Sequence, residues 1–282
     1  MSAVFRHELR RLRGQILGWG LSFALLGWIT VISYNPLIES GLGLQEMVDK
    51  LPPSVMAFFG ESTSLFSAVG YLDMSLFSFV LAILGFFSVL AGAGMLVADE
   101  EAGRLDLIQS YPVSRTAQFA GRALALVVAT VIILALFWAG FLPGLPGSKL
   151  EVTLLSLALP FLPLLAEMLL FSGFALWLSM VLPSRGMATM VAGFLLIGSY
   201  FLTSLARIVM TLKPVARFSP YNYYQGAQAI DGLDLQWFFG LLGIAALFFL
   251  AAWWCYRRRD LRVSGEGSWH MPGIGKPKDK PA

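Results

Sequence analysis

Six apolar stretches, each long enough to cross a lipid bilayer as a helix, constrain this chain more than any other feature. They lie at residues 16–34, 74–98, 123–142, 152–182, 187–206 and 235–256. A spanning helix needs roughly 20 consecutive apolar residues. Hydrophobic residues make up 57% of the chain and charged residues only 13%, whereas about a quarter is typical of soluble domains. We therefore predict an all-α integral membrane protein with six transmembrane helices.

The first stretch follows a basic flank, as the apolar part of a secretory signal does. Its 19 residues exceed the roughly 7 to 15 of a signal peptide, and no clear cleavage site follows, so we expect a retained anchor. Before it, Phe5, Leu9 and Leu12 share one helical face and arginines occupy another. This pattern is typical of an amphipathic helix in the membrane interface. A simple basic topogenic flank explains the arginines equally well.

The distribution of lysine and arginine predicts the orientation, because basic flanks stay on the cytoplasmic side. If both termini are inside, the inner segments hold 12 basic residues, besides three lysines in the distal tail, and the outer segments hold 5. We therefore predict that both termini are cytoplasmic. The net charge of +3 reflects this asymmetry, and nothing suggests a nucleic-acid partner.

The fourth apolar stretch contains two notable features, a pair of prolines and an acidic residue. The stretch 152–182 is longer than one span requires, so we expect a break near Pro160 and Pro163. Glu167 lies near its middle, where a carboxylate costs about 2.5 to 3.5 kcal/mol unless it is paired or protonated. It is either part of a transport pathway or dimer seam, or a neutral structural glutamate, and Arg207 is a possible partner.

Ser88 and Gly92 lie four residues apart in the second stretch. Small residues at this spacing let helices approach closely. They are candidates for a pathway or a dimer seam, but such pairs are frequent in any membrane protein.

One polar segment, residues 99–122, interrupts the apolar pattern between the second and third stretches; we call it the polar island. The charge rule places it in the cytoplasm. We predict a helix from Asp99 to Tyr111 with acidic residues in its first turn, where the helix dipole favours them. Pro112 then ends this helix, and Ser114 is a candidate N-cap for the next one. The result is a helix, a break and a second helix projecting from the inner face.

The polar island resembles the first cytoplasmic loop of the permease subunits of type 2 ABC transporters. That loop carries an acidic stretch, a glycine, an alternating leucine and acidic segment, and a Pro-Val/Ile-Ser-Arg turn. The matching residues here are Glu100, Glu101, Gly103, Leu105, Asp106, Leu107, Pro112, Val113, Ser114 and Arg115. Arg104 departs from the family pattern, in which Thr or Ser is common. The six spans and the Ser-Pro-Tyr loop at residues 219–221 also resemble this family.

The resemblance implies that the island is a coupling helix that docks in a groove of a separate ATPase subunit. The implied docking residues are Asp99, Glu100, Glu101, Gly103, Arg104, Leu105, Leu107, Ile108, Tyr111, Pro112 and Arg115. The implied assembly has two permease chains and two ATPase chains, in the cell membrane of a prokaryote. ATP and magnesium would bind the partner ATPase, and this chain would bind no cofactor. The cargo would be an amphipathic or hydrophobic compound, such as a drug, antibiotic, lipid or peptide, moved outward.

The absence of a nucleotide-binding motif agrees with ATP binding by a separate subunit. The chain has no Gly-x-x-x-x-Gly-Lys-Ser/Thr loop to cradle ATP. An intramembrane enzyme is the weaker alternative, because His7 and His270 lie outside the spans and no second acid in the spans accompanies Glu167. A proton-coupled secondary transporter that uses Glu167 is the stronger one, but it leaves the polar island unexplained. Residues 1–262 are expected to form one permease domain, and 263–282 a disordered cytoplasmic tail.

Overall fold

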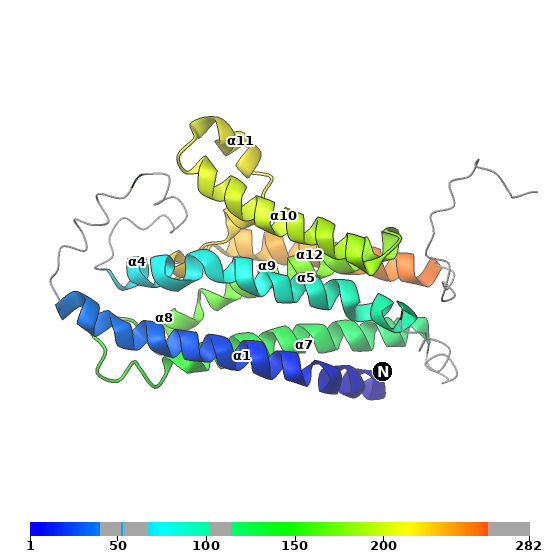
Figure 1. Cartoon of the computed structure of the whole chain (residues 1–282), viewed down its shortest axis with the longest axis horizontal. Coiled ribbons are helices and arrows are strands. Elements are labelled where there is room, and N and C mark those ends of the chain that lie inside the picture. The colour runs from blue at the N-terminus through cyan, green and yellow to red at the C-terminus, as the bar shows by residue number, and fades with distance from the viewer. Residues whose placement is uncertain (40–51, 53–66, 102–113, 259–282) are drawn as a thin grey trace, which may run out of the picture.

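The computed structural model describes residues 1–39, 52, 67–101 and 114–258, and all regular structure in these residues is helical. Six helical elements are long and apolar enough to cross a membrane. They lie alongside one another as a bundle (Figure 1). The prediction of an all-helical fold with six helices able to span a membrane is confirmed for the described residues.

The first helix, α1 (Ser2–Glu39), contains 38 residues without a break, a length of about 57 Å at 1.5 Å per residue. The basic N-terminal segment and the first apolar stretch therefore form a single helix. We expected an interfacial helix distinct from the span, and the structure corrects this division. The physical reason is that no proline separates the two parts; Pro36 is the only proline in α1.

The second membrane element begins earlier than the sequence indicated. Ser67 caps the short helix α4 (Ala68–Leu72) by accepting a hydrogen bond from the Gly70 amide. A five-residue π-helical turn, η1 (Asp73–Phe77), then leads into α5 (Ser78–Glu101). Residues 67–73 thus belong to the membrane element rather than to the outer connection.

The remaining long helices are α7 (Arg115–Phe141), α9 (Phe161–Val181), α10 (Arg185–Ala206) and α12 (Leu235–Arg258). A short helix, α8 (Leu154–Ala158), precedes α9 and is separated from it at residues 159–160. This break confirms the expected interruption of the fourth stretch. Pro163 falls in the first turn of α9, where a missing amide proton costs nothing.

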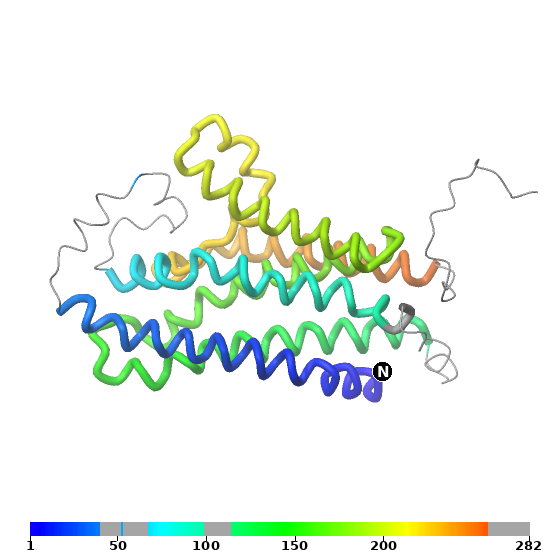
Figure 2. The backbone as a smooth tube through the Cα atoms, viewed as in Figure 1, coloured from blue at the N-terminus to red at the C-terminus, as the bar shows by residue number. Residues whose placement is uncertain are grey.

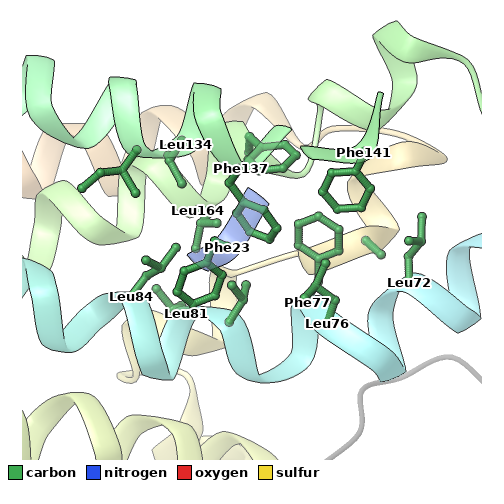
Figure 3. Packing of buried hydrophobic residues seen from close by; sticks show 14 of the residues in the cluster. Phe23, Leu72, Leu76, Phe77, Leu81, Leu84, Leu134, Phe137, Phe141 and Leu164 are labelled. Atoms are coloured by element: carbon green, nitrogen blue, oxygen red, sulfur yellow. The ribbon is translucent and has the colours of Figure 1, made fainter. Parts of the chain in front are cut away.

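The helices pack around α9, which is buried along most of its length. α1 packs mainly on α7, while α5 and α12 pack on α9, and α10 covers α5 and α9. The largest cluster of buried side chains joins α1, η1, α5, α7 and α9, with Phe23, Phe77, Phe137 and Phe141 at its centre (Figure 3). Phe161 packs edge-on against Phe137, with ring centroids 5.0 Å apart.

The bundle has two distinct ends (Figure 2). At one end α1, α7 and α10 begin and α5 and α12 end; we call it the island end, because the polar island connects α5 to α7 there. At the far end lie α4, α8 and the chain between α10 and α12. That chain forms η2 (Met210–Leu212), α11 (Lys213–Ala216), η3 (Pro220–Tyr223) and η4 (Gly226–Ile230).

Candidate functional site

The polar island is described only at its two edges. Residues 102–113 lie outside the described residues, so Gly103, Arg104, Leu105, Leu107, Ile108, Tyr111 and Pro112 are not placed. Asp99, Glu100 and Glu101 form the last turn of α5. We expected them to begin a new helix, and the structure corrects this, because no helix-breaking residue separates Ala98 from Asp99.

The other edge of the island is the start of α7. The Ser114 side chain accepts a hydrogen bond of 3.2 Å from the Ala117 amide, which confirms the predicted N-cap. Arg115 is the first residue of the helix, and its side chain is exposed. The docking residue predicted at this position is therefore accessible at the island end.

One buried arginine links the two helices that flank the island. Arg122 lies two turns into α7 and is only 6% exposed. Its Nη1 atom donates a hydrogen bond of 2.7 Å to the carbonyl oxygen of Met95 in α5. In the sequence, Arg122 counted only as a basic flank. Its position directly before the apolar stretch 123–142 was the available signal. A hydrogen bond to a charged donor is stronger than a neutral one, so this contact fixes α7 against α5 at the base of the island.

The last helix joins the same end. The Tyr256 hydroxyl donates to Gln118 Oε1 of α7 at 3.2 Å, and the ring of Tyr256 lies 6.2 Å from that of Phe119. Next to it, the guanidinium of Arg258 lies 3.9 Å above the ring of Trp254. α5, α7 and α12 are therefore tied together beside the island.

Glu167 lies inside the bundle, in α9, and is completely buried. Neither carboxyl oxygen has a hydrogen-bond partner among the described residues. Arg207, the partner suggested by the sequence, does not hydrogen-bond to it; Arg207 instead follows the last residue of α10 at the far end. An unpaired charged carboxylate in this environment would be very costly, so Glu167 is expected to be neutral here.

Two tyrosines from the far end lie near Glu167. The Tyr221 hydroxyl donates to the Ser78 carbonyl at 2.6 Å, and the ring of Tyr224 packs 5.5 Å from that of Tyr221. Burial raises the pKa of both phenols well above 10.0. Both hydroxyls therefore stay protonated and able to donate.

Asp73 is a second buried acid that the sequence did not reveal. It lies in the π-helical turn, is 5% exposed, and accepts a hydrogen bond of 3.2 Å from the Ala227 amide. Gly226, with φ +55°, lets η4 approach this carboxylate closely. The sequence suggested that Asp73 ends the outer connection, whereas it anchors that end of the molecule.

The comparison with known families shows that the chain is a permease. The matching family is described as the C-terminal domain of the multidrug efflux system permease Rv1217c, and the match covers residues 3–257. All six long helices fall within these residues, except for the first and last residues of the bundle. The chain belongs to this permease family. No curated protein matches the chain.

Membership of this family and the six long apolar helices together identify the chain as a multi-pass membrane protein with a transport role. In the described part of the chain, no group of three or more histidine, cysteine or acidic residues could hold a metal ion. The permease family itself favours a transport subunit over an intramembrane enzyme.

Ser88 and Gly92 of the permease lie within the chain's own packing. Ser88 is fully buried and donates to the Leu84 carbonyl at 3.3 Å. A Cβ atom added at Gly92 would lie 2.9 Å from the Cα atom of Ser172 in α9. Gly92 allows the close approach of α5 to α9, and a dimer contact through either residue stays a prediction.

Proposed function

We propose that this permease is the membrane subunit of a type 2 ABC exporter. The observation that carries the proposal is the match to an efflux permease family along residues 3–257. The sequence lacks a phosphate-binding loop of its own. Under this proposal the energy comes from a partner, a separate ATPase that binds ATP and magnesium.

The polar island is the proposed docking point for that ATPase. Its two edges are the last turn of α5 and the first turn of α7. Because Arg122 fixes α7 to Met95 of α5, a force on the island acts on both helices together. The contact between Tyr256 and Gln118 extends this movement to α12.

The proposed assembly has two permease chains and two ATPase chains in the cell membrane of a prokaryote. The proposed cargo is an amphipathic or hydrophobic compound moved outward. The matching family, described as a multidrug efflux system permease, supports this class of cargo. The Lys and Arg distribution supports a cytoplasmic island end.

Proton-coupled transport through Glu167 is a second candidate function. The complete burial of this carboxyl group without a hydrogen-bond partner favours it, because acidic residues in membrane spans often relay protons. The two candidates differ in their energy source, so one assay separates them.

The deciding experiment reconstitutes the permease into vesicles with and without the ATPase encoded beside it, and follows uptake of a fluorescent amphipathic cation. Under the ATPase proposal, uptake requires both chains and hydrolysable ATP, and an ATPase variant unable to hydrolyse ATP abolishes it. Glu167→Gln then retains uptake. Uptake by the permease alone under a proton gradient, lost in Glu167→Gln, would refute the proposal in favour of proton coupling.

A second experiment tests the docking point. Glu101→Arg is expected to weaken co-purification of the ATPase and to uncouple ATP hydrolysis from uptake while the protein remains in the membrane. The matched control is Glu151→Arg, a charge reversal at an exposed residue of the far end, which should leave both unchanged. Equal behaviour of the two variants would contradict docking at the island.

A further inference from the structure

The chain between α10 and α12 crosses the far end of the bundle and joins its two sides. Its helix η3 contacts α10 and α12, whereas η4 contacts α4, η1, α8 and α9. Figure 1 shows this chain running from α11 to the side of α4 before α12 begins. We call residues 219–230 the far-end strap. The strap therefore bridges helices that belong to both sides of the bundle.

The strap is attached to the two helices that flank it in the sequence. At its start, the Ser219 hydroxyl shares a hydrogen bond of 3.0 Å with the Thr203 hydroxyl of α10. On the side of α12, the Gln225 side chain donates to the Gly232 carbonyl at 3.1 Å and accepts from the Asp234 amide at 2.8 Å. These contacts tie the strap to α10 and α12, so it is expected to move with them.

Two buried hydrogen bonds also hold the strap to the second membrane element. The Tyr221 hydroxyl donates to the Ser78 carbonyl of α5 at 2.6 Å, and the Ala227 amide donates to Asp73 Oδ1 of η1 at 3.2 Å. Gly226 has a φ of +55°, and a Cβ atom there would lie 2.6 Å from Asp73 Oδ1, so glycine permits this approach. π-Helical turns such as η1 are frequent at functional sites. We call these two bonds the latch.

A buried acid lies close to the strap. Glu167 follows the first residue of α9 by six positions, about 9 Å along the helix from the far end. η4 contacts α9, and Tyr221 and Tyr224 lie near Glu167. The carboxyl oxygens of Glu167 and the Tyr224 hydroxyl are buried without a hydrogen-bond partner among the described residues. Such groups are costly to bury, so an arrangement that gives them water would relieve this cost.

We propose that the strap is a gate at the far end of the permease, held shut by the latch, and that its opening admits water to Glu167. When the gate opens, the strap moves with α10 and α12 and separates from η1 and α5. The charge rule assigns the far end to the outside, so the gate controls the release of cargo there. This role rests on the proposed export function, whereas the opening itself requires only the permease chain.

The test measures cysteine labelling in the full-length permease, expressed without an ATPase in a Cys255→Ala background. Glu167→Cys reports on the region beside the strap. Ser179→Cys, a buried position near the other end of the same helix, reports on general loosening of the bundle. A membrane-impermeant maleimide is added to right-side-out or inside-out membrane vesicles, and the rate of labelling is measured for each reporter.

Two matched pairs of substitutions test the latch. Tyr221→Phe removes the buried bond to α5, and its control, Tyr223→Phe, removes an exposed bond that is not part of the latch. Gly226→Ala places a Cβ atom against the carboxylate of η1. Its control, Gly147→Ala, also replaces a glycine with positive φ, but no atom lies within 4 Å of the new Cβ. Each pair makes the same chemical change, so only the contacts of the strap distinguish its members.

In right-side-out vesicles, Tyr221→Phe should raise the labelling rate of Glu167→Cys about fivefold over Tyr223→Phe, as expected for the loss of one buried hydrogen bond. Gly226→Ala should likewise raise it over Gly147→Ala. Equal rates within either pair would overturn the proposal. Labelling that is no faster in right-side-out than in inside-out vesicles would overturn it as well, because the gate would not open outward.

The second reporter separates gating from unfolding. Ser179→Cys should stay unlabelled in all variants, and labelling as fast as that of Glu167→Cys would overturn the proposal in favour of general loosening. If Glu167→Cys does not fold, Leu164→Cys, buried one turn nearer the start of α9, takes its place. These measurements involve no ATPase, so the gate can fail while the ATPase proposal stands, and the uptake experiment tests that proposal separately.

Discussion

Gly92 offers a sharp test of how closely α5 and α9 pack. In Gly92→Ala the new Cβ atom would contact the carbonyl oxygen of Ser172 and lie 2.9 Å from its Cα and C atoms. Carbon atoms in contact normally lie about 3.5 to 4.0 Å apart. These are backbone atoms of a helix, so they cannot rotate away, and the two helices must separate.

The expected magnitude follows from two opposing effects. Overpacking of this kind typically costs about 1 to 3 kcal/mol, while alanine gains about 0.8 to 1 kcal/mol over glycine in a helix. We expect a net loss of up to about 2 kcal/mol from the free energy of unfolding. The same substitution at Gly193 of α10, which has no atom within 4 Å of the new Cβ, should instead be neutral or stabilising by up to about 1 kcal/mol.

The assay heats detergent-solubilised protein and measures the fraction that remains monodisperse by size-exclusion chromatography. The apparent melting temperature should fall for Gly92→Ala and stay or rise for Gly193→Ala. Because the two variants make an identical chemical change within helices, only the neighbouring atoms distinguish them. Equal stability of the two variants would refute the argument that α5 and α9 are in backbone contact at Gly92.

Three further outcomes are measurable by the same assay. Tyr221→Phe removes the buried 2.6 Å hydrogen bond to the Ser78 carbonyl and should lower the stability by about 1 kcal/mol. Tyr223→Phe removes an exposed hydrogen bond to the Arg217 carbonyl and should lower it less. The reverse order would contradict the role of Tyr221. Ser114→Ala should lower the stability by about 1 kcal/mol, because α7 loses its N-cap. Thr116→Ala, at an exposed position of the same helix turn, is the control. An equal effect of the two variants would show that the Ser114 cap does not stabilise α7. Glu167→Gln, a neutral side chain of the same size, should leave the melting temperature nearly unchanged, while Glu167→Lys should cost about 3 to 5 kcal/mol; tolerance of lysine would show that the site is hydrated.

The existence of the helices was predictable because length and hydrophobicity are local properties of the sequence. The break near Pro160 was predictable for the same reason, since proline acts on its own helix. Helix ends proved harder to place. Residues 67–73 precede the apolar stretch that begins at residue 74, so the sequence did not include them in the span. The hydrogen bond from the Ala227 amide to Asp73 comes from a segment 154 residues away along the chain.

The partners of the polar side chains could not be predicted, because they depend on how the helices pack in three dimensions. The burial of Glu167 followed from its position in an apolar stretch. The absence of a contact with Arg207 did not follow, because the relative depth of α9 and α10 was unknown. For Arg122, the sequence showed the residue but not its partner. Its acceptor is a backbone carbonyl, and every residue has one, so the sequence could not indicate which carbonyl accepts.

The length of α1 has a consequence for hydrophobic mismatch. Even at a tilt of about 40°, the upper end of the usual range, a 30 Å hydrocarbon core takes up about 26 residues of helix. About a dozen of the 38 residues of α1 must therefore lie outside the core at any tilt. Because the helix is unbroken, a change in tilt of 10° about its midpoint displaces its start by about 5 Å. A local change in bilayer thickness that alters the tilt of α1 would therefore move Glu8 and Arg11, which lie near the start of this helix.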